Sequence, residues 1–430
     1  IYFVQLPQSA IDDPTGRWLA RYALDGLDFL IASARALWAK RPPSKGTRKT
    51  LVVNLSWGPQ TGPHDGSSLL EQAFDQRVAE CDGDGITLHV VLPAGNSYEG
   101  RAHAQWPAGA GCPDLQWQVM ADAGHTQFLE VWWPAGTALT DVDLTVHSPD
   151  GHSLRLKGAN LPPVGRGALL SADARHSWGI TVAPHKDRFM ALLAVAPTRP
   201  KDDRGHPPHG RWILSIGPAP SSTEGSLVHV YLARNAANMG GRRRGPDGYL
   251  FDPLYEATRH GRWPRTEPSK EPNTSRVRRE GTLNGIATGD KPEVVAAYVS
   301  ARNERAVGAN PSEVAVASNY SASGPGAHAQ RTPERNPDLA PPGDASPYLR
   351  GVLAAGVREG TAVRLVGTSA AAPQLARKRA NGEKLRPVAN PRRGVQPPAP
   401  PPPTPAPEPV RRGRRVGAGT VPMDLPRPTQ

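Results

Sequence analysis

The residues best suited to chemistry in this chain lie in short stretches that are far apart in the sequence. Ser369 follows Gly367 and Thr368 and precedes a run of alanines, which predicts a tight turn leading into a helix. At a helix N-terminus the free backbone N–H groups and the positive end of the dipole favour a developing oxyanion. Ser369 is therefore a candidate nucleophile for acyl transfer, and the alternative is an ordinary N-capping serine.

Two further stretches each read as a buried strand with polar residues at its end. The apolar run 88–92 leads into Gly95 and Asn96. Glycine lets the chain turn there, and the asparagine amide can then point at a carbonyl oxygen, although a strand-end turn residue is the alternative. The apolar run 51–55 leads into residues 56–58, which are Ser-Trp-Gly.

Taken in this order, the three stretches resemble the motifs of the subtilisin-like serine proteases (subtilases, peptidase family S8). That family shows an N-x-S-x-G strand, an A-G-N turn and a G-T-S-x-A-x-P helix, which match residues 54–58, 94–96 and 367–373. Weaker similarities are found at 281–287, 320–325 and 337–343, so the resemblance covers roughly residues 1–115 and 275–380.

The resemblance implies a hydrolase that cleaves polypeptides through an acyl-enzyme on Ser369. Asn96 and the Ser369 amide would hold the oxyanion, and Thr368 would support the same site. Ser56, Trp57 and Gly58 would bind the substrate backbone as an added strand. Trp57 would form one wall of a specificity pocket, and a core tryptophan is the alternative.

The base and its orienting carboxylate are missing from the expected places. In subtilases an Asp in a D-[ST]-G turn and a His in an H-G-[TS] helix precede the helix predicted at residue 17. His64 falls in the wrong register, His89 alternates within a buried strand, and the turn 12–16 is not followed by a histidine helix. We expect a fragment that lacks the N-terminal part of its domain and, alone, hydrolyses peptides poorly. The alternative is an inactive subtilase-like protein that binds peptides or partners.

The pattern of the chain predicts an α/β fold: an incomplete parallel-sheet core of subtilisin type, an inserted β-sandwich-like domain, and a disordered Pro/Arg-rich tail. Apolar residues at three- and four-residue steps predict a helix over residues 17–40. A second helix is predicted from a cap at Ser67 or Ser68 to about Glu80. The apolar residues 1–5 predict a short strand. The predicted divisions are 1–114 and 281–380 (core), 115–232 (β-rich insertion), 233–280 (irregular linker) and 381–430 (tail).

The composition gives little support to other partners. Residues 377–430 contain 12 Lys and Arg against 3 Asp and Glu, which accounts for +9 of the formal net charge of +12, so the charge is not a nucleic-acid signal. No apolar run has the length of a membrane span. No metal-ligand or cofactor motif is visible, and the resemblance leaves a structural calcium open.

Cys81 and Cys112 either pair or stay free. The family suggests secretion or the cell envelope, but no signal peptide is visible because the chain starts at Ile1.

Overall fold

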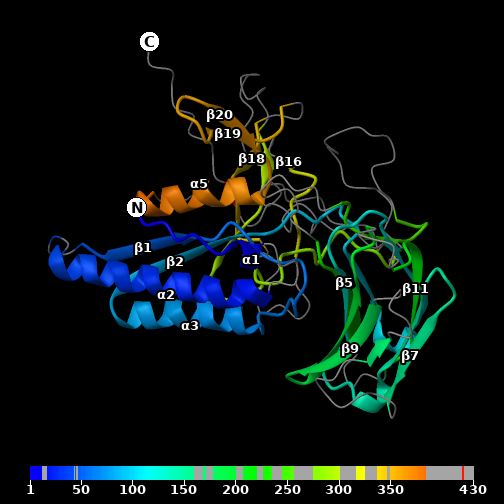
Figure 1. The fold of residues 1–430 in the computed structure, drawn as a ribbon. Helices are drawn as coiled ribbons and strands as arrows, with labels where there is room; N and C mark the ends of the chain where they lie inside the picture. Colours follow the sequence, from blue (N-terminus) through cyan, green and yellow to red (C-terminus); the bar gives the residue numbers. More distant parts are fainter. Residues whose placement is uncertain are drawn as a thin grey trace, which may run out of the picture.

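The computed structural model describes an α/β part and, beside it, a β-rich part between residues 103 and 255 (Figure 1). It describes residues 1–11, 17–42, 44, 47–158, 168–170, 178–199, 207–219, 226–234, 245–255, 275–300, 316–324, 337–345, 349–383 and 419–420. Within these ranges no helix combines the length and the apolar character needed to cross a membrane.

The α/β part is built on a sheet whose described strands follow the order β1-β2-β14-β17-β21. These strands are β1 (Lys49–Asn54), β2 (Ile86–Pro93), β14 (Glu293–Val295), β17 (Leu339–Ala340) and β21 (Gly419–Thr420). Every neighbouring pair runs parallel. Apart from β21, the predicted tail beyond residue 383 lies outside the described residues.

Helices cover both faces of this sheet. The helices α2 (Arg17–Lys40) and α3 (Leu69–Gly83) lie on one face and α5 (Thr368–Ala380) on the other (Figure 1). Successive side chains of a strand point to opposite faces, so Leu88, Val90 and Leu92 of β2 join the core under α2 and α3. Val91 packs instead with Ala371 and Ala372 of α5, whose small side chains let the helix approach the sheet closely.

Local sequence explains where these helices form. Leu19, Ala23, Leu27 and Ile31 of α2 recur every four residues and are all buried. The helix α3 begins with a capping box, in which the Ser68 hydroxyl accepts from Glu71 N at 3.3 Å and Glu71 Oε2 accepts from Ser68 N at 3.4 Å. Both helices lie where the periodicity predicts them.

The β-rich part consists of two antiparallel sheets. One has the order β3 (His103–Pro107), β12 (Leu227–Leu232), β5 (Gln127–Trp132), β10 (Arg188–Val195), β9 (Trp178–His185) and β8 (Ala168–Leu170). The other has the order β13 (Tyr249–Phe251), β4 (Cys112–Val119), β11 (Gly210–Ile216), β6 (Asp143–His147) and β7 (Ser153–Lys157). One continuous apolar core joins them and contains five buried tryptophans: Trp106, Trp117, Trp133, Trp178 and Trp212.

Short elements complete the described chain. They are α1 (Gln8–Ile11), η1 (Ala108–Ala110), η2 (Leu139–Asp141), a small sheet of β16 (Val316–Ala317), β15 (Tyr298–Val299) and β18 (Pro342–Asp344), and a hairpin of β19 (Val352–Ala355) and β20 (Ala362–Leu365). The hairpin directly precedes α5.

Several details differ from the expectations. Residues 1–5 form no strand, because they pair with no neighbouring strand among the described residues. The segment expected to be irregular contributes β13, which pairs with β4. The two antiparallel sheets reach from His103 to Phe251, beyond 115–232 on both sides, and the division into domains stays a prediction. Both cysteines are free and buried, Cys81 in the α/β part and Cys112 in the β-rich part.

Candidate active site

The turn before α5 is shaped by a glycine that no other residue could replace without strain. Gly367 has φ of 124°, and a Cβ placed on it would lie 3.1 Å from Asn96 Nδ2. Thr368 is the first residue of α5 and Ser369 the second. The Ser369 N–H is therefore one of the first four of the helix, which have no acceptor within the helix. Ser369 is half-buried, so solvent reaches it.

Asn96 lies against this turn with its carboxamide held in one orientation. Its Oδ1 accepts hydrogen bonds from Thr368 N at 2.9 Å and from Thr368 Oγ1 at 3.1 Å. The buried Thr368 hydroxyl also accepts from Gly95 N at 3.1 Å. The two bonds to the oxygen fix the orientation of the carboxamide. Its Nδ2 end donates to no acceptor among the described residues, and Asn96 is exposed. The arrangement leaves an amide donor open to solvent beside the turn that carries Ser369.

Ser56 makes the contact that joins the third stretch to Ser369. Pro373 stands four residues after Ser369 in α5 and has no N–H, so the Ser369 carbonyl lacks its usual partner within the helix. The Ser56 hydroxyl donates to that carbonyl at 3.0 Å and itself accepts from Asn54 Nδ2 at 2.9 Å. The proline in the motif could have indicated that an outside donor was needed.

Asn284 joins the ends of β1 and β2, and the sequence did not single it out. Its Nδ2 donates to Pro93 O at 3.1 Å, and its N–H donates to Ala94 O at 2.7 Å. A Cβ on Gly58 would lie 2.8 Å from Asn284 Nδ2, and one on Gly95 would lie 2.7 Å from Oδ1. Both glycines are therefore needed to admit this buried side chain, and their presence at both strand ends is the signal that could have revealed it.

Two aromatic residues complete the surroundings of the turn. Trp57 is half-buried and packs against the core under α2 and α3, so part of its ring belongs to that core. The Tyr320 hydroxyl accepts from Gly367 N at 3.2 Å. Burial raises the pKa of Tyr320, which keeps this hydroxyl protonated.

Neither histidine of the first 95 residues contacts Ser369 among the described residues. His64 is fully buried, donates from Nε2 to Gln60 O at 2.8 Å, and has its pKa lowered to about 3, mainly by burial. His89 Nδ1 lies 2.7 Å from Glu293 Oε1, and Arg379 of α5 donates twice to the other oxygen of that carboxylate. The turn 12–16 lies outside the described residues.

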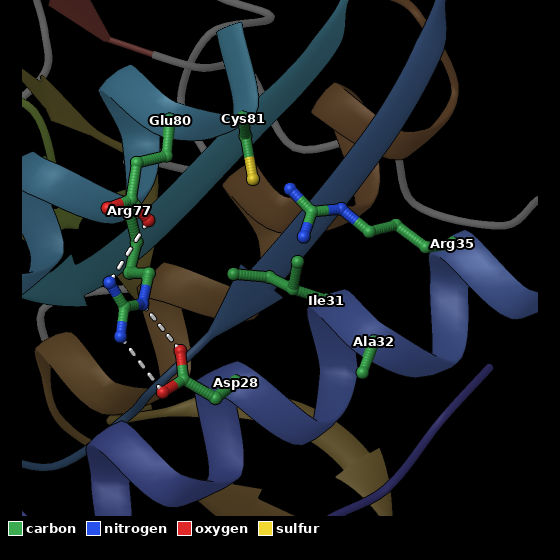
Figure 2. A pocket seen from close by; sticks show the side chains of 7 residues that line it. All are labelled: Asp28, Ile31, Ala32, Arg35, Arg77, Glu80 and Cys81. Carbon is green, nitrogen blue, oxygen red and sulfur yellow. Dashed lines mark hydrogen bonds and ion pairs between the residues drawn. The ribbon is translucent and has the colours of Figure 1, made fainter. Parts of the chain in front are cut away.

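A separate pocket lies between α2 and α3 (Figure 2). It encloses about 350 Å³ and is lined by Asp28, Ile31, Ala32, Arg35, Arg77, Glu80 and Cys81. Arg77 donates to Asp28 at 2.6 and 3.1 Å and to Glu80 at 3.0 Å, and burial raises the pKa of Cys81. Both of its arginines are paired, Arg77 with Asp28 and Glu80 and Arg35 with Asp84, and its thiol is held protonated, so the pocket offers no activated nucleophile. No cluster of three metal-binding side chains was found within the described part of the chain.

Comparison with known proteins supports the fold. No protein-family model matches the chain, and no curated protein does. A solved structure, that of the Clostridium perfringens CspB protease, is similar with a TM-score of 0.52 and 20% identity. The match covers 83% of this chain and 59% of the other, so the chain spans somewhat more than half the length of that protease. The chain thus has a protease-like α/β fold.

Proposed function

We propose that this chain carries the nucleophile and oxyanion half of a subtilisin-like serine endopeptidase. Ser369 attacks the scissile carbonyl, and the Asn96 amide and the Ser369 N–H hold the resulting oxyanion. One observation carries the proposal: Asn96 and Thr368, 272 positions apart, are joined through two hydrogen bonds that engage only the oxygen of the carboxamide. An amide fixed in this way is a ready donor for negative charge developing on a substrate.

Residues of this chain can be given positioning roles before the step in which the Ser369 hydroxyl loses its proton. Ser56 fixes the backbone of Ser369, Thr368 fixes Asn96, and Tyr320 fixes the turn at Gly367. A serine hydroxyl also needs a base to take its proton, and none of the described residues that contact Ser369 is a histidine. The base and its orienting carboxylate would therefore come from residues outside those described.

The substrate is proposed to bind as an extended strand at residues 56–58. Main-chain hydrogen bonds would supply much of the affinity, and the exposed part of Trp57 would contact a neighbouring apolar side chain. Asn284 lies beneath Gly58 and Gly95, so it would form the polar floor between the two strand ends.

An inactive protein that binds peptides or partners is the second candidate. The observation in its favour is that no histidine contacts Ser369 among the described residues. Against it, Ser56 holds the backbone of Ser369 and Asn96 that of Thr368, through hydrogen bonds that peptide binding alone does not require.

The test is reaction with a fluorophosphonate probe. In the protein produced from the complete natural gene, we expect rapid labelling that mass spectrometry locates at Ser369, together with peptide hydrolysis, and neither in Ser369→Ala. The 430-residue chain alone should be labelled slowly, because no residue of its described part supplies a base beside Ser369. Peptide binding without labelling or hydrolysis in the complete protein would favour the inactive alternative. Rapid labelling of the isolated chain would show that the base lies within it.

A further inference from the structure

We propose that the β-rich part is a positioning device for the loop of residues 59–67, with Arg188 and Glu130 as its positioning residues. This loop directly continues the strand end 56–58. Its effect on substrate binding rests on the proposed function, but its effect on the loop itself does not. The β-rich part would then be a support of the site and not an independent binding module.

The loop has a backbone conformation that needs outside support. Gly62, His64 and Gly66 all have positive φ, at 137°, 54° and 76°. His64 is not a glycine, so its left-handed conformation is unfavourable unless its surroundings hold it. On the side of the α/β part, Gly285 N donates to Pro59 O at 2.7 Å and Gly66 N donates to Thr288 Oγ1 at 3.1 Å. These bonds, together with one from Gln60 Nε2 to Thr282 O at 3.3 Å, hold the loop on the side of the α/β part, and its residues 62–67 also contact the β-rich part.

Glu130 of β5 holds the middle of the loop by its backbone. Its Oε2 accepts from Gly62 N at 2.9 Å and from Trp132 Nε1 at 2.9 Å. Burial raises the pKa of this carboxyl group. Withdrawing a carboxyl group from water is costly unless its hydrogen bonds are made, so this half-buried contact favours one position of Gly62.

Arg188 of β10 contacts Pro63 and Asp65, the residues on either side of His64. It is 3% exposed, donates to Pro63 O at 3.2 Å and lies 3.5 Å from the Asp65 carboxylate. Its guanidinium also lies over the ring of Trp132, 4.9 Å from the centroid. A buried guanidinium that meets both a carbonyl and a carboxylate of one loop fixes that loop in direction as well as in position.

The tip of the loop is enclosed by rings. The His64 ring stacks on Tyr231 of β12 with centroids 3.7 Å apart, and His103 stacks on Tyr231 at 4.7 Å. Ser67 Oγ and His185 Nε2 are 2.6 Å apart at the end of the loop. Contacts from β5, β9, β10 and β12 thus converge on nine consecutive residues.

The surface of the β-rich part argues against a separate aromatic binding platform. Among its described residues no Trp, Tyr or Phe is exposed, because its aromatic side chains lie in the core or against neighbouring strands. Rings that stack on sugars or other flat ligands would have to face solvent. The polar side chains that meet the loop are instead buried, as is Arg188, or half-buried, as are Glu130 and His185, and all are engaged there.

Hydrogen exchange of the 430-residue chain, followed by mass spectrometry, tests the proposal without requiring catalysis. In Arg188→Met, which removes the donor to Pro63 O, and in Glu130→Leu, which removes the acceptor for Gly62 N, peptides covering residues 58–67 should exchange about tenfold faster or more, while peptides of β4 and β11 keep their protection. Arg188→Lys should restore part of the protection. Arg155→Met is the matched control, because Arg155 pairs with Asp143 at the exposed face of β6 and β7.

Two results would overturn the proposal: unchanged exchange of residues 58–67 in folded variants, or a uniform loss of protection throughout the β-rich part. If Arg188→Met does not fold, Glu130→Leu, which changes a half-buried residue to an apolar one of similar size, decides alone. In the complete protein the same variants should raise KM for peptides more than they lower kcat. If residues 58–67 exchange faster in the variants but the unmutated complete protein does not hydrolyse peptides, the positioning role is supported and the proposed function is rejected.

Discussion

The α/β part and the β-rich part use their polar side chains in opposite ways. At the strand ends of the α/β part, Asn96 is exposed and Ser369 half-buried, and each keeps a polar group available to solvent. Where the β-rich part meets the loop 59–67, Arg188 is buried and Glu130 half-buried, and both are engaged by that loop. The groups proposed to meet a substrate thus lie after the end of β2 and at the start of α5, whereas the groups that hold the loop 59–67 lie in the β-rich part.

The largest expected effect concerns the open donor of Asn96. Removing one such donor from a subtilisin lowers turnover roughly 100- to 1,000-fold, and we expect a loss of that order for Asn96→Ala in the complete protein. Asn96→Asp keeps an acceptor for Thr368 but has no donor, so it should lose at least as much. Both are measured as kcat with a peptide substrate. Full activity of Asn96→Asp would remove Asn96 from the oxyanion site.

The next effect concerns the free energy of unfolding in acid, which depends on the buried histidines where the loop 59–67 meets the β-rich part. Burial lowers the pKa of His64 to about 3 and that of His103 to about 4, both from 6.5. Between pH 6.5 and 4 the unfolded chain therefore binds protons that the folded chain does not, and stability falls as the pH falls.

His64→Asn isolates the contribution of His64, since asparagine tolerates the positive φ there. Between pH 6.5 and 4 the parent should lose about 3 kcal/mol more unfolding free energy than this variant. Denaturant titrations at a series of pH values measure the difference. Glu71 and Glu130, whose pKa values burial raises, oppose this trend equally in both proteins. Parallel pH profiles for parent and variant would contradict a neutral buried His64.

The smallest effect compares two serine-to-carbonyl hydrogen bonds. Ser56→Ala removes the donor to Ser369 O and should lower the unfolding free energy by about 1 kcal/mol. It should also reduce kcat, because the carbonyl beside the nucleophile loses its only described side-chain donor. Ser215→Ala is the control, since Ser215 donates to Pro113 O in the β-rich part. Equal effects of both variants on kcat would argue against a specific role for Ser56.

The parts of the fold that follow from local patterns could be predicted from the sequence. The four-residue spacing in residues 17–40 and the apolar runs of β1 and β2 need only their own side chains to be recognised. The strand expected at residues 1–5 is wrong because a strand requires a partner, which a local pattern does not reveal. β13 was missed for the opposite reason: its three residues form a strand only because β4 lies beside them.

For the candidate site, the motifs predict that Asn96 and Ser369 share one site, and Asn96 is hydrogen-bonded to Thr368, the residue before Ser369. Their catalytic roles stay predictions. Asn284 and Tyr320 lie in the weaker motif stretches 281–287 and 320–325 and Arg188 in none, but the partner of each is more than 45 positions away in the sequence, so no local pattern indicates the contact.

A crystal structure of the complete protein after reaction with a peptidyl fluorophosphonate would test the central claim most directly. The account predicts phosphorus bonded to Ser369 Oγ, with one phosphoryl oxygen about 3 Å from both Asn96 Nδ2 and Ser369 N. A phosphoryl oxygen directed away from Asn96, or an adduct on another residue, would contradict it.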